Sequence, residues 1–205
     1  DAATFRAQFA IDARTGCEAV AVSPAGKTVQ LRDVASGELR TEAYDKLVLS
    51  PGALSIRPPL PGIDLPGIFQ VRTVPDARAI REWIEGGTTY LSGLFNYSGI
   101  QFVRPTRRAV VVGGGFIGLE TAENLIHAGF EVTLLEMLDQ VVAPLDEEFA
   151  RLVQEHLKRH GVRLALGDGV AAFGQLDGGA LEVRTKSGRV HPADIVILAL
   201  GVRPD

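Results

Sequence analysis

The sequence contains a single cysteine, Cys17, so the chain can form neither an internal disulfide nor a cysteine-ligated metal cluster. Its four histidines are scattered and no pair has the spacing of a metal site, so we expect no bound metal. No apolar run approaches the roughly 20 residues that a membrane-spanning helix needs. Residues 1–10 also lack the basic and apolar regions of a signal peptide. We therefore expect a cytoplasmic protein that does not enter a membrane.

An excess of positive charge is absent as well. The chain has 21 Lys and Arg against 25 Asp and Glu, a net charge of −4, which argues against a nucleic-acid-binding surface. Hydrophobic residues make up 46% and charged residues 22%, as in globular proteins that bury a core. The length of 205 residues corresponds to one large domain or two small ones.

The sequence does contain a glycine-rich turn between a predicted strand and a predicted helix. The apolar run Val110–Val112 leads into Gly113, Gly115 and Gly118, which are spaced G-x-G-x-x-G. A helical pattern follows and ends at Gly129, and a second strand, residues 131–136, ends on an acidic residue. This order of strand, turn, helix and strand is the context that a dinucleotide-binding fingerprint requires.

Each glycine of the motif has a mechanical reason. Gly113 allows a sharp turn, Gly115 lets the backbone approach a pyrophosphate, and Gly118 lets the helix lie close to the sheet. The pyrophosphate would sit on free N–H groups at the positive end of the helix dipole. Glu136 follows Gly113 by 23 positions, where a carboxylate can bind both ribose hydroxyls and repel a 2′-phosphate, which favours NADH. The alternative is a tight turn without a ligand.

The first half of the chain shows short strands and a proline-rich passage. The pattern predicts a helix end at residues 4–9, an antiparallel meander over 18–22 and 28–32, and an apolar strand over 44–50. Residues 57–67 are too rich in proline and glycine for a helix or a central strand. A strand over 68–71 and a helix over 76–85 follow, and residues 86–107 read as a linker or as a lid or partner-docking segment.

The second half predicts an α/β arrangement. Asp146 is a plausible N-cap of an amphipathic helix that ends before Gly161, and a parallel strand follows over 162–166. Short antiparallel strands are expected over 170–173, 181–185 and 189–190. Residues 194–200 are apolar at nearly every position, as in a strand that is covered on both faces.

Four segments together resemble the FAD-dependent pyridine nucleotide–disulfide oxidoreductases, most closely the CoA-disulfide reductase and NADH oxidase branch. They are Tyr44–Ala53, Pro61–Ile63, Gly113–Glu120 and Ala199–Pro204. The resemblance implies a partial FAD-binding domain with a β-meander over 1–85, a linker or insertion over 86–106, and a Rossmann-like NAD(H)-binding domain over 107–205. The last would combine a parallel sheet with an antiparallel meander.

The resemblance also implies roles for individual residues. Phe116 matches an aromatic gate that covers the flavin until the nicotinamide displaces it, and Glu120 matches a carboxylate near the nicotinamide and the flavin N5. From the residues alone, Phe116 could equally pack at the helix start and Glu120 could be a surface acid. The remaining NADH contacts implied are Gly113, Gly114, Gly115, Ile117, Gly118, Glu136 and Gly201; those to FAD are Ser50, Pro51, Gly52 and Arg72.

The family's own FAD fingerprint, its redox cysteine and its C-terminal dimerisation domain have no counterpart in these 205 residues. The sequence therefore resembles an internal portion of a homodimeric flavoprotein that passes hydride from NADH to FAD and on to a disulfide, persulfide or oxygen. We expect the chain alone to bind NADH, to retain flavin weakly or not at all, and to show no turnover. The alternatives are a non-enzymatic NAD-sensing module and an S-adenosylmethionine-dependent methyltransferase, whose G-x-G-x-G loop Ile117 does not match.

Overall fold

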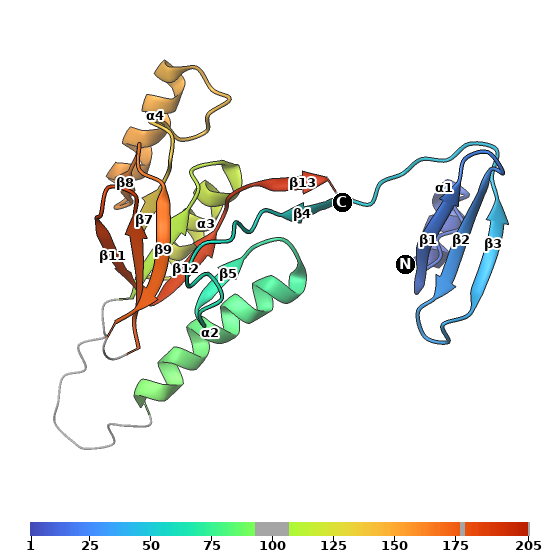
Figure 1. The fold of residues 1–205 in the computed structure, drawn as a ribbon, viewed down its shortest axis with the longest axis horizontal. Coiled ribbons are helices and arrows are strands. Elements are labelled where there is room, and N and C mark those ends of the chain that lie inside the picture. Colours follow the sequence, from blue (N-terminus) through green and yellow to red (C-terminus); the bar gives the residue numbers. More distant parts are fainter. Residues whose placement is uncertain (93–106, 177–178, 205) are drawn as a thin grey trace. The chain divides into compact units, whose positions relative to one another are not determined.

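The computed structural model describes residues 1–92, 107–176 and 179–204, and the chain divides into two compact units, Asp1–Pro51 and Gly52–Asp205 (Figure 1). The first unit contains helix α1 (Ala2–Phe9) and strands β1 (Cys17–Ser23), β2 (Thr28–Asp33) and β3 (Leu39–Ala43). The strands pair in the order β1-β2-β3, and both pairs are antiparallel. The predicted helix end and the antiparallel strands over 18–22 and 28–32 are thus confirmed, with β1 and β2 slightly longer than expected, whereas strand β3 was not predicted.

The apolar strand predicted over residues 44–50 was wrong. The chain is irregular there, and Val48 and Leu49 are 86% and 67% exposed. An isolated apolar run becomes a strand only when a neighbouring strand satisfies its backbone N–H and C=O groups. No strand among the described residues pairs with this run.

The second unit is built on a parallel sheet of five strands. Its members are β5 (Ile68–Gln70), β6 (Arg108–Val112), β7 (Glu131–Leu135), β8 (Arg163–Ala165) and β12 (Ile195–Leu198), in the order β5-β12-β6-β7-β8. All four neighbouring pairs are parallel. Strand β12 and residues 109–112 of β6 are buried throughout, because both faces of the sheet are covered.

Helices cover one face of this sheet and a second sheet covers the other (Figure 1). The helices are α2 (Val74–Ser92), α3 (Phe116–His127) and α4 (Glu147–Arg159). On the opposite face lies an antiparallel sheet of β9 (Val170–Gln175), β10 (Leu181–Thr185) and β11 (Val190–Ala193), in the order β11-β10-β9. The parallel sheet has a hydrophobic core on each face, and alternate residues of β6 point into one or the other. Val111 belongs to the core on the helix side with Leu125 of α3, and Val110 belongs to the core on the side of the second sheet with Val183 of β10. The predicted α/β fold is confirmed.

Two features of the second unit differ from expectation. Helix α2 continues through Gly86 to Ser92, because a helix interior tolerates glycine at a cost of about 1 kcal/mol. Strands β4 (Ala53–Ser55) and β13 (Val202–Pro204) form an antiparallel pair that the sequence pattern did not reveal. The rest of the expected linker, residues 93–106, lies outside the described residues.

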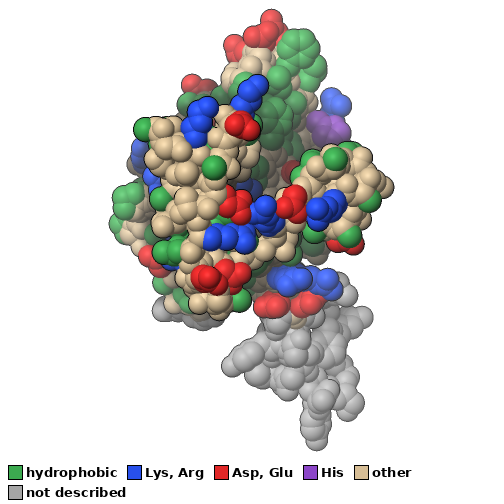
Figure 2. Space-filling model, turned by 90° about the vertical axis from the view of Figure 1, so that its right-hand side faces the viewer, with side chains coloured by type: hydrophobic (Ala, Val, Ile, Leu, Met, Phe, Trp, Pro, Cys, Tyr) green, Lys and Arg blue, Asp and Glu red, His purple; other side chains and the backbone are tan. Residues whose placement is uncertain are grey.

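The surface of the second unit includes an apolar area on α4. Phe149 and Leu152 of this helix are 58% and 68% exposed. Figure 2 shows hydrophobic side chains gathered at the upper end, where α4 lies in Figure 1. In the described parts of the chain, none of the helices combines the length and the hydropathy needed to cross a bilayer.

Candidate nucleotide-binding site

The turn from β6 into α3 leaves no room for a side chain at two of its positions, Gly113 and Gly118. Gly113 has φ +110°, and a β-carbon there would lie 2.2 Å from the carbonyl oxygen of Ala199. A β-carbon on Gly118 would lie 1.9 Å from the carbonyl oxygen of Gly113. The loop therefore packs directly against both the end of β12 and the first turn of α3.

Gly115 stands at the N-cap of α3 and is open to solvent. Its backbone is extended, no side chain among the described residues caps it, and a β-carbon there would meet no atom within 4 Å. The amides of Gly115, Phe116 and Ile117 donate no hydrogen bond to any described residue. Free amides at the positive end of a helix form a ready site for an anionic group such as a phosphate.

The carboxylate of Glu136 faces this loop from the end of β7. Its Oε2 accepts a hydrogen bond of 2.6 Å from the amide of Gly114, and its Oε1 accepts one of 2.9 Å from the amide of Leu138. An ionised carboxylate has about four acceptor positions, so each oxygen can still accept a hydrogen bond from a sugar hydroxyl. The acid is thus already held in place beside the glycine turn.

The loop between β7 and α4 closes over the glycine turn. The amide of Val142 donates a hydrogen bond of 2.8 Å to the carbonyl oxygen of Gly114, and the Gln154 side chain accepts one of 3.2 Å from the amide of Val141. Val142 is only 2% exposed and has φ +47°, a conformation that costs a β-branched residue about 1–3 kcal/mol. Sequence reasoning missed this residue, because valine ordinarily indicates an extended backbone.

Phe116, Glu120 and Gly201 lie near the same edge of the sheet. Phe116 is 71% exposed in the first turn of α3, and Glu120, also exposed, follows it by one helical turn. Gly201 follows β12, has φ +88°, and only the Ile56 side chain comes within 4 Å of a β-carbon placed there. In parallel α/β sheets, ligands bind at the carboxyl ends of the strands, which is the edge that these residues share.

The residues expected to contact FAD fall on both sides of the boundary between the units. Ser50 and Pro51 end the first unit and are exposed. Gly52 begins the second unit with φ +88°, and a β-carbon there would lie 3.2 Å from Nη2 of Arg72. The Arg72 Nε donates a hydrogen bond of 2.9 Å to the Ala53 carbonyl oxygen, so its guanidinium is fixed beside Gly52.

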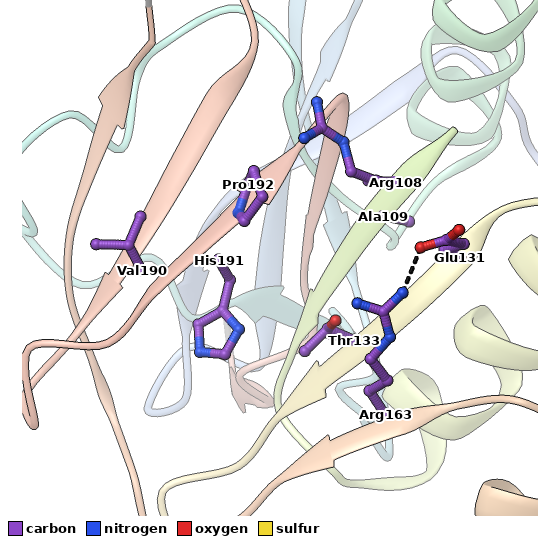
Figure 3. Close-up of a pocket in the computed structure, with 8 residues that line it drawn as sticks. All are labelled: Arg108, Ala109, Glu131, Thr133, Arg163, Val190, His191 and Pro192. Carbon is purple, nitrogen blue, oxygen red and sulfur yellow. Dashed lines mark hydrogen bonds and ion pairs between the residues drawn. The ribbon is translucent and has the colours of Figure 1, made fainter. Parts of the chain in front are cut away.

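A cavity of about 160 Å³ lies at the other edge of the sheet, where the strands begin (Figure 3). Arg163 pairs with Glu131, and Nη2 of Arg108 lies 3.0 Å from Oδ1 of Asp194. Burial lowers the pKa of His191, and its Nε2 has no hydrogen-bond partner among the described residues. Because both arginines are already paired with acids, this cavity is a poor site for a dinucleotide. Its lining is completed by Ala109, Thr133, Val190 and Pro192.

Comparisons with known proteins identify the family of this chain. An NADH oxidase of Enterococcus faecalis is 33% identical over 180 residues, which cover 87% of this chain and 36% of that protein. A CoA-dependent NAD(P)H sulfur oxidoreductase of Pyrococcus abyssi is 33% identical over 196 residues, covering 95% and 39%. The chain thus spans little more than a third of the length of these relatives.

Solved structures of oxidoreductases also superpose on this chain. The reduced CoADR-RHD of Bacillus anthracis superposes with a TM-score of 0.80 at 41% identity and covers 98% of this chain and 33% of that one. A NAD-dependent persulfide reductase from A. fulgidus also gives 0.80, at 32% identity, and covers 100% and 34%. The pyridine nucleotide-disulphide oxidoreductase family matches residues 2–205. This chain therefore belongs to the pyridine nucleotide-disulphide oxidoreductase family, as the resemblance of its four segments indicated.

Proposed function

We propose that this chain is the NADH-binding portion of a flavin-dependent oxidoreductase that passes hydride from NADH to FAD and on to a disulfide, persulfide or oxygen. One observation carries the proposal: the free amides of Gly115, Phe116 and Ile117 follow directly on Gly114, whose own amide holds the carboxylate of Glu136. The pairing of an open helix start with an oriented acid suits a pyrophosphate joined to a ribose.

The residues fit NADH without rearrangement of the loop. The free amides bind the pyrophosphate, and no side chain needs to leave Gly115 first. Glu136 accepts hydrogen bonds from the adenosine ribose hydroxyls, and its charge disfavours the 2′-phosphate of NADPH. Phe116 gates the flavin face, while Glu120 and Gly201 border the nicotinamide end.

The flavin nucleotide would be approached by Ser50, Pro51 and Gly52 and by the guanidinium of Arg72. Arg72 is fixed by Ala53 but keeps N–H donors for a phosphate. When bound, nicotinamide and flavin supply the hydride chemistry, while the protein holds them in contact and excludes water. The names of the relatives, NADH oxidase and persulfide reductase, support a whole protein of this class.

Titration of the purified chain with NADH and with NADPH by calorimetry tests the proposal. We expect saturable binding of NADH, weaker binding of NADPH, and no steady loss of NADH absorbance when oxygen is the only acceptor. Equal or tighter binding of NADPH would contradict the role of Glu136. Binding of S-adenosylmethionine in place of NADH would assign the glycine loop to a methyltransferase.

A further inference from the structure

The backbone that carries Glu136 is held by the segment after β8. The Glu136 amide donates a hydrogen bond of 2.9 Å to the Ala165 carbonyl oxygen, and the Asp168 amide donates one of 3.1 Å to the Glu136 carbonyl oxygen. The Gly167 amide donates a further hydrogen bond of 2.9 Å to the Leu138 carbonyl oxygen. Residues 165–168 therefore extend the pairing of β7 with β8 along the stretch that bears the acid.

This segment is in turn tied to the turn between β10 and β11 by the carboxylate of Asp168. Asp168 is 3% exposed and accepts hydrogen bonds from the amide and hydroxyl of Ser187, at 3.1 and 2.6 Å. Its Oδ2 also lies 3.1 Å from Nε and 3.0 Å from Nη2 of Arg189. A backbone hydrogen bond of 2.8 Å from Lys186 to Gly169 joins the same two loops. We call Asp168, Ser187 and Arg189 the Asp168 cluster.

The chemistry of the cluster indicates that the carboxylate stays charged. The Ser187 hydroxyl, with help from Thr185, the Ser187 amide and the Arg189 charge, lowers the pKa of Asp168 to about 2. Only the Asp168 carboxylate is buried, since the Arg189 side chain is 58% exposed. Moving a buried carboxylate away from its donors would leave a desolvated charge without partners, which is costly, so the carboxylate is confined to this arrangement. The cluster therefore fixes where the 165–168 segment lies.

We propose that Asp168 is a positioning residue of the nucleotide site: by anchoring residues 165–168 it holds the Glu136 carboxylate against the amides of Gly114 and Leu138. The turn between β10 and β11 thereby becomes part of the machinery that selects NADH, although none of its residues belongs to the glycine loop. The effect on NADH rests on the proposed function, whereas the effect on Glu136 does not.

A double-mutant cycle tests whether Asp168 acts through Glu136. Asp168→Asn should weaken NADH binding by the full 205-residue chain about tenfold, the loss expected for one weakened charge-assisted hydrogen bond. In a Glu136→Gln background, Asp168→Asn should weaken NADH binding by less than about twofold, because the Glu136 carboxylate that Asp168 positions is no longer present. Additive losses would overturn the proposal, since a general loosening of the fold acts with or without Glu136.

Asp194→Asn provides a matched control at the other edge of the sheet. Asp194 accepts a hydrogen bond of 2.8 Å from the Arg108 amide and pairs with its guanidinium, so it too joins two segments. This variant should lower stability and leave the affinity for NADH unchanged. If Asp168→Asn does not fold, Ser187→Ala is the second variant. It removes the 2.6 Å hydrogen bond to Asp168 and the hydroxyl's contacts with Nε of Arg189 at 3.0 Å and Oγ1 of Thr185 at 3.2 Å, and it keeps the bond from the Ser187 amide to Asp168. It should show the same pattern with a smaller loss.

Amide hydrogen exchange measured by NMR tests the positioning without any nucleotide. Asp168→Asn should speed exchange at Gly114 and Leu138, whose amides bond the Glu136 carboxylate, and Asp194→Asn should not. Unchanged exchange at both amides overturns the proposal. Faster exchange in a chain that binds no NADH supports the positioning and refutes the proposed function instead.

Discussion

The two edges of the parallel sheet differ in how completely their polar groups are paired. At the edge where the strands begin, Arg108 is paired with Asp194 and Arg163 with Glu131. At the edge where the strands end, the amides that open α3 have no partner in the described chain, and Glu136 uses one acceptor position on each oxygen.

The difference separates the proposed binding site from a surface whose charged groups are already paired. Both edges carry charged side chains and both leave polar groups unused among the described residues. At the other edge the unused group is a ring nitrogen, Nε2 of His191, whereas the carboxyl edge presents three successive amides near an oriented carboxylate. Glycine makes this possible, because an open backbone at Gly115 exposes amides that any side chain would partly cover. Binding capacity therefore follows from hydrogen-bonding groups that folding leaves unused.

The largest effect is expected at Gly118. A β-carbon there would lie 1.9 Å from a backbone oxygen, so Gly118→Ala should destabilise the fold by about 3 kcal/mol. Gly115→Ala, by contrast, meets no atom within 4 Å and should leave stability within about 0.5 kcal/mol. Urea unfolding measures both values. Gly115→Ala should nevertheless weaken NADH binding about tenfold or more, because a methyl group would occupy open space beside the amides proposed to bind the pyrophosphate.

Two outcomes for Gly115→Ala would contradict the contrast between the two edges of the sheet. If Gly115→Ala lost stability, the open helix start would be a packed corner. If it kept full affinity for NADH, the pyrophosphate would bind elsewhere.

The next effect compares the two ends of one strand. Glu131 begins β7 and Glu136 follows its end. Glu136→Gln should weaken NADH binding about tenfold and narrow the preference over NADPH, because a neutral amide no longer repels a 2′-phosphate. Glu131→Gln removes an exposed ion pair with Arg163, should cost less than about 1 kcal/mol, and should not change either affinity. Competitive titration with NADH and NADPH measures the ratio of the two affinities in each variant.

The sequence predicted the carboxyl edge better than its surroundings. The glycine spacing indicates the turn because steric exclusion at Gly113 and Gly118 is local and leaves a residue signature. Strand β12 is apolar throughout, so its burial on both faces was also foreseeable. The roles proposed for Phe116, Glu120 and the flavin-side residues come from the resemblance alone, because no local pattern indicates them.

Features that depend on distant partners were not predictable. Residues 44–50 have the composition of a strand but no pairing partner in the described chain, whereas β4 and β13 are short and lack periodicity yet pair across the unit. Asp168 gives no sequence signal, because its partners Ser187 and Arg189 lie on another element. The burial of the Asp168 carboxylate depends on the loop that covers it, so it can be recognised only in the folded structure.

A smaller effect concerns acid stability. The folded-state pKa of Asp168 is about 2, below its ordinary 3.8, so its contribution is fully present above pH 3.8 and is lost as the pH falls through about 2. Wild-type chain should therefore lose stability more steeply over this range than Asp168→Asn. Urea midpoints measured at several pH values give the pH dependence of stability for the wild-type chain and for Asp168→Asn. Parallel slopes would mean that Asp168 titrates alike in the folded and unfolded states.

The smallest effect is expected at His191, beside the paired charges of the other edge. Burial, reinforced by Arg189, lowers its pKa below the ordinary 6.5, so the unfolded chain binds a proton more readily than the folded one. Stability should fall gently as the pH drops below about 6.5, and His191→Phe should flatten that slope. A control substitution at His127 should retain that slope. The affinity for NADH should be unchanged in both variants, because the proposed nucleotide site lies at the opposite edge of the sheet. A loss of NADH affinity in His191→Phe would show that the two edges are coupled.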